Sequence, residues 1–220
     1  MLDLLATRVL PALVFGLATS GLLWLIGLAR KRAALTLALT LAAVFLAGSW
    51  PATLLVTAQV ALVAVAAKLL HTRARLRSRD AMALTSVAAL IAWGRLLGTV
   101  PVYWDAALVG ALAGAATAWT GAAASEHWTG ARVRLLTLRK AGRGGMNGTG
   151  ITVGLAAGIV VAACGVALDH LGPGEPALAV VGGLLGTAVA DTVFRRRTGL
   201  VLTASLVGGA VAAALVAYLP

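Results

Sequence analysis

The sequence predicts an all-α, polytopic membrane protein, with about eight transmembrane helices in a single domain over residues 1–220. The first observation is composition: 60% of the residues are hydrophobic and only 11% are charged, whereas soluble domains average about 25% charged residues. The second is a series of apolar windows, and the third is that basic residues gather in every second connector. Because backbone polar groups in lipid must be satisfied within their own segment, helices are the expected form.

The apolar windows are about 18–21 residues long, close to the ~20 residues that a helix needs to cross ~30 Å of hydrocarbon. They cover residues 9–29, 33–50, 52–70, 81–98, 106–125, 150–168, 177–194 and 200–219. The first window follows Asp3 and Arg8 and is long enough to span, so we interpret it as a transmembrane helix rather than a cleavable signal peptide. The second and third windows meet at Pro51, and the sequence allows two structures for this pair, a helical hairpin or one irregular unit.

The connectors alternate in charge, and this alternation predicts the topology. Most of the 18 lysines and arginines follow the first, third, fifth and seventh windows, at residues 30–32, 73–79, 132–143 and 195–197. Under the positive-inside rule these connectors face the cytoplasm, which places both termini outside it and the chain in the cytoplasmic membrane. We therefore attribute the net charge of +11 to topology and expect no nucleic-acid partner.

This topology brings three acids from distant windows to the inner membrane boundary: Asp80, Glu126 and Asp191. Carboxylates there can pair with neighbouring arginines or hold Mg²⁺, which usually takes one or two carboxylates together with substrate phosphates. Asp80 is also a suitable N-cap for the fourth span, and Asp191 can pair with Arg195. An ionisable residue within a span is costly, however, which makes Asp191 a functional-site candidate. For these acids the structural and functional interpretations both stay open.

The longest inner connector is rich in glycine and in basic residues. Its glycines, at positions 142, 144, 145, 148 and 150, remove side chains so that backbone N–H groups can approach an anion. A helix that begins near Gly150 would add its positive N-terminal end, while Arg139, Lys140 and Arg143 supply charge. The connector therefore predicts a phosphate-binding loop, although it lacks a Walker pattern. A flexible basic connector between two spans is the alternative.

Three polar residues elsewhere are interpreted as structural. Arg95, at the outer end of the fourth span, is expected to extend to the membrane interface. His170 is expected to be a solvated loop residue, and Gln59, in the middle of the third span, is expected to tie helices together.

Three segments, taken together, resemble one integral membrane family. The first is residues 45–84, which end in an Arg-Asp-Ala element. The second joins "AASEHW" to "RLLTLRKAGRGGMNGTGITVG", and the third is "GGLLGTAVADTVF". In this order, over about residues 33–195, the chain resembles the family named domain of unknown function 92, which contains phytyl-phosphate kinases and transmembrane protein 19.

The resemblance implies a helical membrane fold distantly similar to polyprenol kinases and cytidylyltransferases. The implied activity is phosphorylation of an isoprenoid monophosphate to a diphosphate by a nucleoside triphosphate. Matched residue by residue, the family elements fall on Arg79, Asp80, Ser125, Glu126, Gly145, Asn147, Gly148, Gly150 and Asp191. With Arg139, Lys140 and Arg143 these residues form the predicted site. In it the three acids would act in catalysis and hold Mg²⁺, and the other residues would bind phosphate.

Two departures separate the chain from the family pattern. Gly121 stands where the family has an Asp, and the Gln-x-x-x-Asn-Gly that follows the Arg-Asp element is absent. If that Asp holds the metal, this chain is inactive or has moved the role to another acid. The alternative function is therefore a non-catalytic binder or scaffold for anionic membrane lipids, with the oligomeric state left open. A small transporter is the third candidate, with only Gln59 and Asp191 as polar groups within the membrane.

Overall fold

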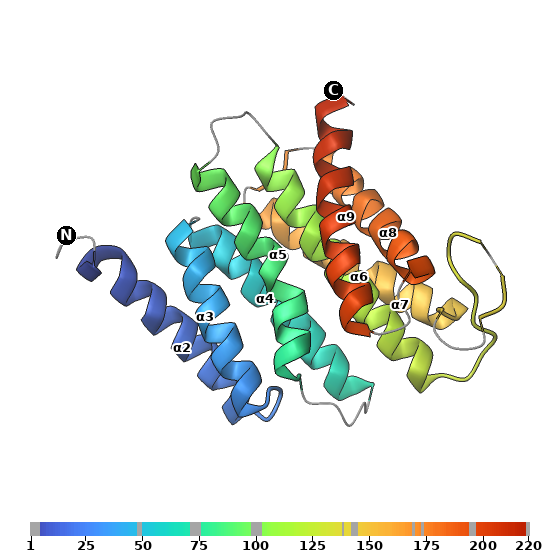
Figure 1. Cartoon of the computed structure of the whole chain (residues 1–220), viewed down its shortest axis with the longest axis horizontal. Coiled ribbons are helices and arrows are strands. Elements are labelled where there is room, and N and C mark those ends of the chain that lie inside the picture. Colours follow the sequence, from blue (N-terminus) through green and yellow to red (C-terminus); the bar gives the residue numbers. More distant parts are fainter. Residues whose placement is uncertain are drawn as a thin grey trace.

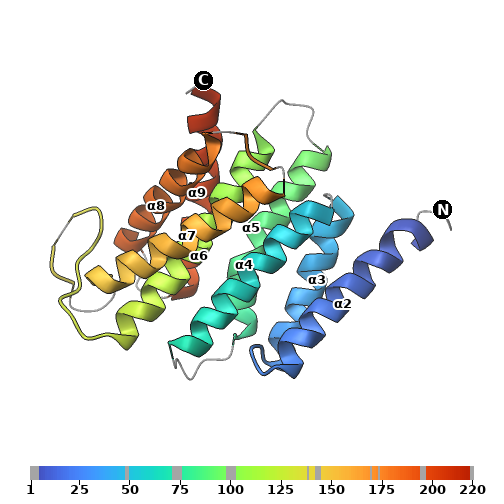
Figure 2. The same ribbon diagram turned by 180° about the vertical axis from the view of Figure 1, so that it is seen from behind.

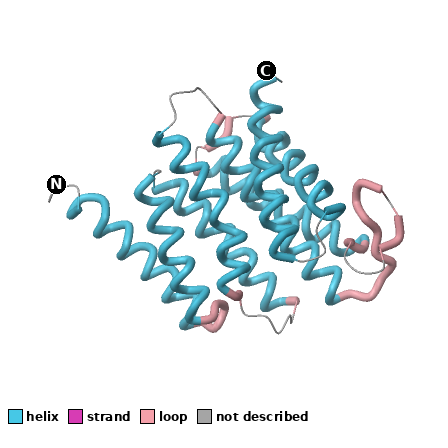
Figure 3. Tube along the Cα trace, in the orientation of Figure 1, coloured by secondary structure: helices cyan, strands magenta, loops and turns pink. Residues whose placement is uncertain are grey.

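The computed structural model describes residues 5–47, 50–70, 76–97, 103–137, 139–141, 145–168, 170–172, 174–193 and 197–218. Within these ranges the chain is helical and forms no named β-strand, as the all-α prediction requires (Figures 1 and 3). Its elements are η1 (Leu5–Val9), α2 (Leu10–Leu25), α3 (Lys31–Ala47), α4 (Trp50–Leu69), α5 (Ser78–Leu97), α6 (Trp104–His127), α7 (Gly148–Ala167), α8 (Glu175–Val193) and α9 (Arg197–Tyr218). The predicted site residue Arg143 and the predicted ion-pair partner Arg195 lie outside the described residues.

Seven helical segments are long and apolar enough to cross a membrane, namely Thr7–Leu25 and the helices α4 to α9. They indicate a multi-pass membrane protein, as predicted. The helix α3 is not among these seven segments. It has 17 residues, and at ~1.5 Å per residue it is about 26 Å long, slightly less than the ~30 Å hydrocarbon core. The second and third windows form separate helices, and Pro51 lies in the first turn of α4, where its missing N–H removes no helical bond.

Successive helices run in opposite directions, so that the connectors fall alternately at the two ends of the bundle (Figure 1). We call the end that holds the α2–α3, α4–α5, α6–α7 and α8–α9 connectors the basic end. Its described basic residues include Arg30, Lys31, Arg77, Arg132 and Arg197. The other end, which we call the opposite end, holds the remaining connectors. The alternation of charge in the sequence thus corresponds to an alternation in space.

α6 is the central helix of the bundle (Figures 1 and 2). In its spanning window 94% of the residues are buried, against 22% for Thr7–Leu25 at the edge of the molecule. Small residues allow this burial: a Cβ atom on Gly114 would lie 2.5 Å from the carbonyl oxygen of Ala204 in α9, and one on Gly208 would lie 2.8 Å from that of Gly110. Because helices in lipid associate through close contact of small-residue faces, α6 and α9 pack backbone against backbone.

Candidate functional site

The connector between α6 and α7 is folded in its described part. Val133 forms antiparallel bridges with Lys140 and with Met146. The backbone N–H of Arg134 donates to the carbonyl of Arg139 at 3.0 Å, and Val133 and Met146 exchange two backbone bonds of 3.0 Å. The described residues of this connector, which we call the α6–α7 loop, therefore form a hydrogen-bonded turn rather than an unstructured basic linker.

Asn147 attaches the α6–α7 loop to both of its helices. Its Oδ1 accepts from the backbone N–H of Gly150 at 2.8 Å, which caps the N-terminus of α7. Its Nδ2 donates to the carbonyl of Trp128 at 2.8 Å, and its backbone N–H donates to Oγ of Ser125 at 3.1 Å. Both Asn147 and Ser125 are buried. Predicted as phosphate-binding residues, they bind the protein itself in this structure.

The structure explains why glycine is required at two of the predicted loop positions. Gly145 has a φ of +73°, in the left-handed region that glycine adopts at little cost. Gly150 is buried where α7 crosses α6, and a Cβ atom there would overlap Oγ of Ser125. Gly148, the first residue of α7, is exposed. Of these three glycines, only Gly148 is available to a ligand at the surface.

Asp80 caps its own helix. As the third residue of α5 it accepts a hydrogen bond at its Oδ2 from the backbone N–H of Arg77, at 3.2 Å. This is the reciprocal half of a capping box, in which an acid in the first turn satisfies the N–H that precedes the helix. Its neighbour Arg79 is exposed. The capping alternative for Asp80 is therefore supported by its contacts.

Glu126, in the last turn of α6, is exposed and forms an ion pair with Arg197 in the first turn of α9. The guanidinium of Arg197 also lies over the ring of Trp119, 5.2 Å from its centroid, and Trp119 is fully buried in α6. This places one arginine between a carboxylate and an aromatic face, an arrangement that stabilises the charge. Sequence reasoning treated Arg197 only as part of a basic run, and its pairing with Glu126 depends on helix packing.

Asp191, in the last turn of α8, is buried and accepts a hydrogen bond at its Oδ2 from the backbone N–H of Leu135 at 3.1 Å. Arg134 donates to the carbonyl of the next residue, Thr192, at 3.4 Å. Both contacts join the α6–α7 loop to the end of α8. The other oxygen of Asp191, Oδ1, is buried and has no hydrogen-bond partner among the described residues.

The three predicted acids do not fit a shared Mg²⁺ site. Among the described residues no three His, Cys, Asp or Glu side chains lie close enough together to hold a metal ion, and each acid has a partner of its own, namely Arg77, Leu135 or Arg197. Gly121, at the position of the family Asp, is buried against α7, and a Cβ atom there would lie 2.9 Å from both the carbonyl oxygen of Gly150 and Sδ of Met146. A carboxylate has no room at that position, so we assign no step to a metal.

The α6–α7 loop lines an open depression of about 410 Å³, which we call the loop pocket. Its lining includes Arg132 and Lys140, which lie on the two hydrogen-bonded segments of this turn. One N–H of Arg132 donates to the carbonyl of Ser125 at 2.8 Å. Within the described part of the chain, no ion pair involves either residue. The loop pocket thus presents two cations without a carboxylate, beside the last turn of α6.

Only part of this pocket was predicted from the sequence. Lys140 was a predicted phosphate-binding residue, whereas Arg132 was counted only in the basic run. Arg139 is exposed, and its carbonyl accepts the bond from Arg134. A hairpin pairing of residues 132–134 with 139–141 would have brought Arg132 to Lys140, but the sequence carries no strong turn signal that fixes this register.

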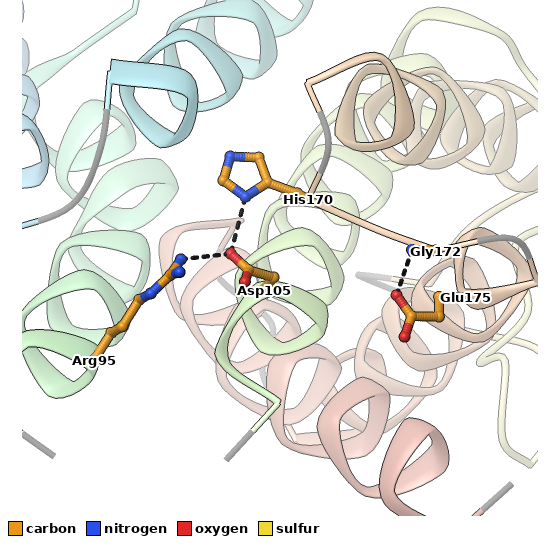
Figure 4. Close-up of polar contacts among 5 residues, drawn as sticks. All are labelled: Arg95, Asp105, His170, Gly172 and Glu175. Carbon is orange, nitrogen blue, oxygen red and sulfur yellow. Dashed lines mark hydrogen bonds and ion pairs between the residues drawn. The ribbon is translucent and has the colours of Figure 1, made fainter. Parts of the chain in front are cut away.

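A second polar cluster lies at the opposite end of the bundle (Figure 4). There Oδ1 of Asp105, in the first turn of α6, accepts from Nη1 of Arg95 at 2.7 Å and lies 2.9 Å from Nδ1 of His170. Because a carboxylate can only accept, Nδ1 carries the proton. The side chain of His170 is only 5% exposed, so the expectation of a solvated His170 is wrong. Arg95 forms an ion pair, which the sequence interpretation missed.

The chain matches none of the protein-family models with which it was compared. Neither the curated proteins nor the solved structures that were compared match it. The resemblance to the phytyl-phosphate kinase family therefore stays a prediction that rests on the quoted segments, and the function must be argued from the geometry of the chain itself.

Proposed function

We propose that this chain is a multi-pass membrane protein that binds the phosphate group of a lipid in the loop pocket, with isoprenoid phosphates as the first candidates. The observation that carries the proposal is the pair Arg132 and Lys140, held across one pocket of about 410 Å³. A guanidinium can bind two phosphate oxygens at once through its planar fork of N–H groups. Among the described residues, one N–H of Arg132 is bound to Ser125 and the others have no partner, which leaves them for a ligand.

The proposal includes an orientation. The basic end faces the cytoplasm under the positive-inside rule, and both termini lie outside the cytoplasm. The loop pocket then lies at the cytoplasmic boundary, where the tail of a lipid can stay in the membrane while its phosphate reaches Arg132. The phosphate class rests on the charges of the pocket, and the isoprenoid class rests on the resemblance described above.

The test is a binding measurement on the purified full-length chain in phosphatidylcholine nanodiscs, with farnesyl phosphate as the probe. The variant Lys140→Gln removes one charge without disturbing the bond between Arg132 and Ser125. We expect its affinity for farnesyl phosphate to fall about ten-fold, since a hydrogen bond to a charged group contributes about 1.5–3 kcal/mol. The matched control is Lys68→Gln, which removes an exposed lysine of the same end, outside the pocket.

Two further ligands measure the contributions of the phosphate group and of the isoprenoid tail to binding separately. Farnesol tests the tail alone, and inorganic phosphate tests the head alone. We expect both to bind more weakly than farnesyl phosphate, and binding of farnesyl phosphate to persist in a chelator. Equal affinities of the wild type, Lys140→Gln and Lys68→Gln for farnesyl phosphate would contradict the proposal.

The second candidate function is transfer of a phosphoryl group from a nucleoside triphosphate to that lipid phosphate. The observation that favours it is Asp191, because its buried Oδ1 lacks a partner among the described residues and the residue lies against the α6–α7 loop. A buried carboxylate oxygen without a hydrogen bond is costly, and such groups gather at functional sites.

An assay of diphosphate formation from farnesyl phosphate and a panel of nucleoside triphosphates tests this candidate. We expect Asp191→Asn to lower turnover by about 100-fold, the lower end of the range for loss of a positioned general acid or base, while Asp80→Asn stays close to the wild type. Binding of farnesyl phosphate is measured on the same samples, so that a folding defect is recognised. If the wild type binds the probe and forms no product, the transferase candidate is excluded and the binding function stands alone.

A further inference from the structure

A groove of about 250 Å³ runs between α2 and α3, away from the α6–α7 loop. Its walls are mainly apolar. From α2 they include Leu17, Gly21 and Trp24, and from α3 they include Lys31, Leu35 and Ala38. We call it the α2–α3 groove. It lies on the edge of the bundle formed by its N-terminal helices, whereas the α6–α7 loop lies on the other edge (Figures 1 and 2).

The α2–α3 groove is open on its outer side. The spanning segment that contains α2 has the lowest buried share of the seven candidate spans, 22%. A Cβ atom on Gly21 would meet no atom within 4 Å, so this position leaves empty space along the groove. Leu17 and Leu35 beside it are more than half exposed. In a helix that crosses a membrane, such an open apolar surface faces the hydrocarbon chains of lipids.

One end of the groove carries a cation. Lys31 is the first residue of α3, and its Nζ lies 5.6 Å from the centroid of the Trp24 ring, in a cation–π contact. None of the ion pairs among the described residues includes Lys31. Arg30 and Arg32 flank it and are exposed. The groove therefore has apolar walls along its length and an unneutralised positive charge at the basic end.

We propose that the α2–α3 groove is a binding site for an anionic membrane lipid, with one hydrocarbon chain along Leu17 and Gly21 and the phosphate at Lys31. The argument for this occupant is charge complementarity, because clusters of lysine and arginine at a membrane boundary attract anionic headgroups. Trp24 supports it, since tryptophan favours the level of the headgroups. This site is separate from the loop pocket and does not depend on the function proposed for it.

Native mass spectrometry of the full-length chain, with dioleoyl phosphatidylglycerol and dioleoyl phosphatidylcholine as probes, tests the proposal. In Gly21→Leu the new side chain enters the empty space of the groove, and we expect loss of both bound lipids. In Lys31→Gln we expect the preference for phosphatidylglycerol to fall about five-fold, the effect of one lysine at the boundary. The matched controls are Ala18→Leu, on the exposed part of α2, and Lys68→Gln, which removes an exposed lysine of the basic end outside the groove, and both are expected to bind as the wild type does.

Several outcomes would overturn this site. The first is an unchanged number of bound lipids in Gly21→Leu, and the second is an equal affinity of the wild type for the two lipids. A third is a dimer of the wild type that Gly21→Leu dissociates, because a second copy of the chain would then occupy the groove. Glycerol phosphate binding as tightly as phosphatidylglycerol would show that the apolar groove is not used. Lys140→Gln serves to separate the two proposals, because the effect of Lys31→Gln on the preference for phosphatidylglycerol must be the same with and without it.

Discussion

The two halves of this bundle are packed in different ways. Among α6 to α9, glycines bring backbones into contact, as Gly114 does with Ala204. Among α3 to α5, no buried position is a glycine, and the alanines there lie between larger buried side chains, which include Leu37, Leu41, Val56, Val60 and Leu84. The glycine-packed half holds the α6–α7 loop at fixed positions on α6 and α8, whereas the α2–α3 groove beside Gly21 is open at the edge next to the other half. The comparison indicates that one half suits a defined headgroup site and the other a lipid-lined edge.

The largest expected effect is that of Gly114→Leu. Its Cβ atom would lie 2.5 Å from the carbonyl oxygen of Ala204, so α6 and α9 must separate, and we expect a loss of more than about 3 kcal/mol in the free energy of unfolding. Gly21→Leu is the matched control, because nothing lies within 4 Å of its Cβ position. Thermal unfolding in detergent compares the two variants. If both unfold at the temperature of the wild type, the two halves do not differ in packing.

The second effect concerns the other half. Leu41 is fully buried in α3, and Leu41→Ala would leave a cavity that costs about 2–4 kcal/mol. Leu39→Ala is the control on the same helix, since Leu39 is 60% exposed, and we expect it to change stability by less than about 0.5 kcal/mol. The same thermal measurement checks both. Equal losses for the two variants would mean that α3 does not face the core as described.

The helices were predictable from the sequence because hydropathy is a local property. The windows 106–125 and 150–168 lie within α6 and close to the bounds of α7, and the capping contact of Asp80 joins residues only three apart. The site contacts are of another kind. Asp191 meets Leu135 across 56 residues, and Glu126 meets Arg197 across 71. Such pairs depend on which helices pack together, and the sequence pattern does not encode that arrangement.

The third prediction tests how firmly the glycine-packed half holds its loop. Asn147→Ala removes the N-cap of α7 and the bond to Trp128, and we expect a loss of about 1–2 kcal/mol. Because the α6–α7 loop would then have fewer contacts with α6, trypsin should cleave after Lys140 faster than in the wild type. Thr152→Ala is the control, because its hydroxyl bonds only to the carbonyl of Gly148 within α7. Unchanged cleavage in Asn147→Ala would show that the remaining contacts of the loop, with Ser125 of α6 and with α8, are sufficient to hold it.

The smallest expected effect is at the joint between the halves, where Arg95 of α5 pairs with Asp105 of α6. Their side chains are 49% and 37% exposed, and ion pairs with this access to solvent contribute about 0.2–1 kcal/mol. A double-mutant cycle with Arg95→Gln and Asp105→Asn measures this coupling, and the asparagine keeps an oxygen for Nδ1 of His170. A coupling below about 1 kcal/mol means that side-chain packing between α5 and α6 joins the halves. A coupling above about 2 kcal/mol would mean instead that this ion pair contributes substantially to holding α5 against α6. The difference in packing would then matter less for stability.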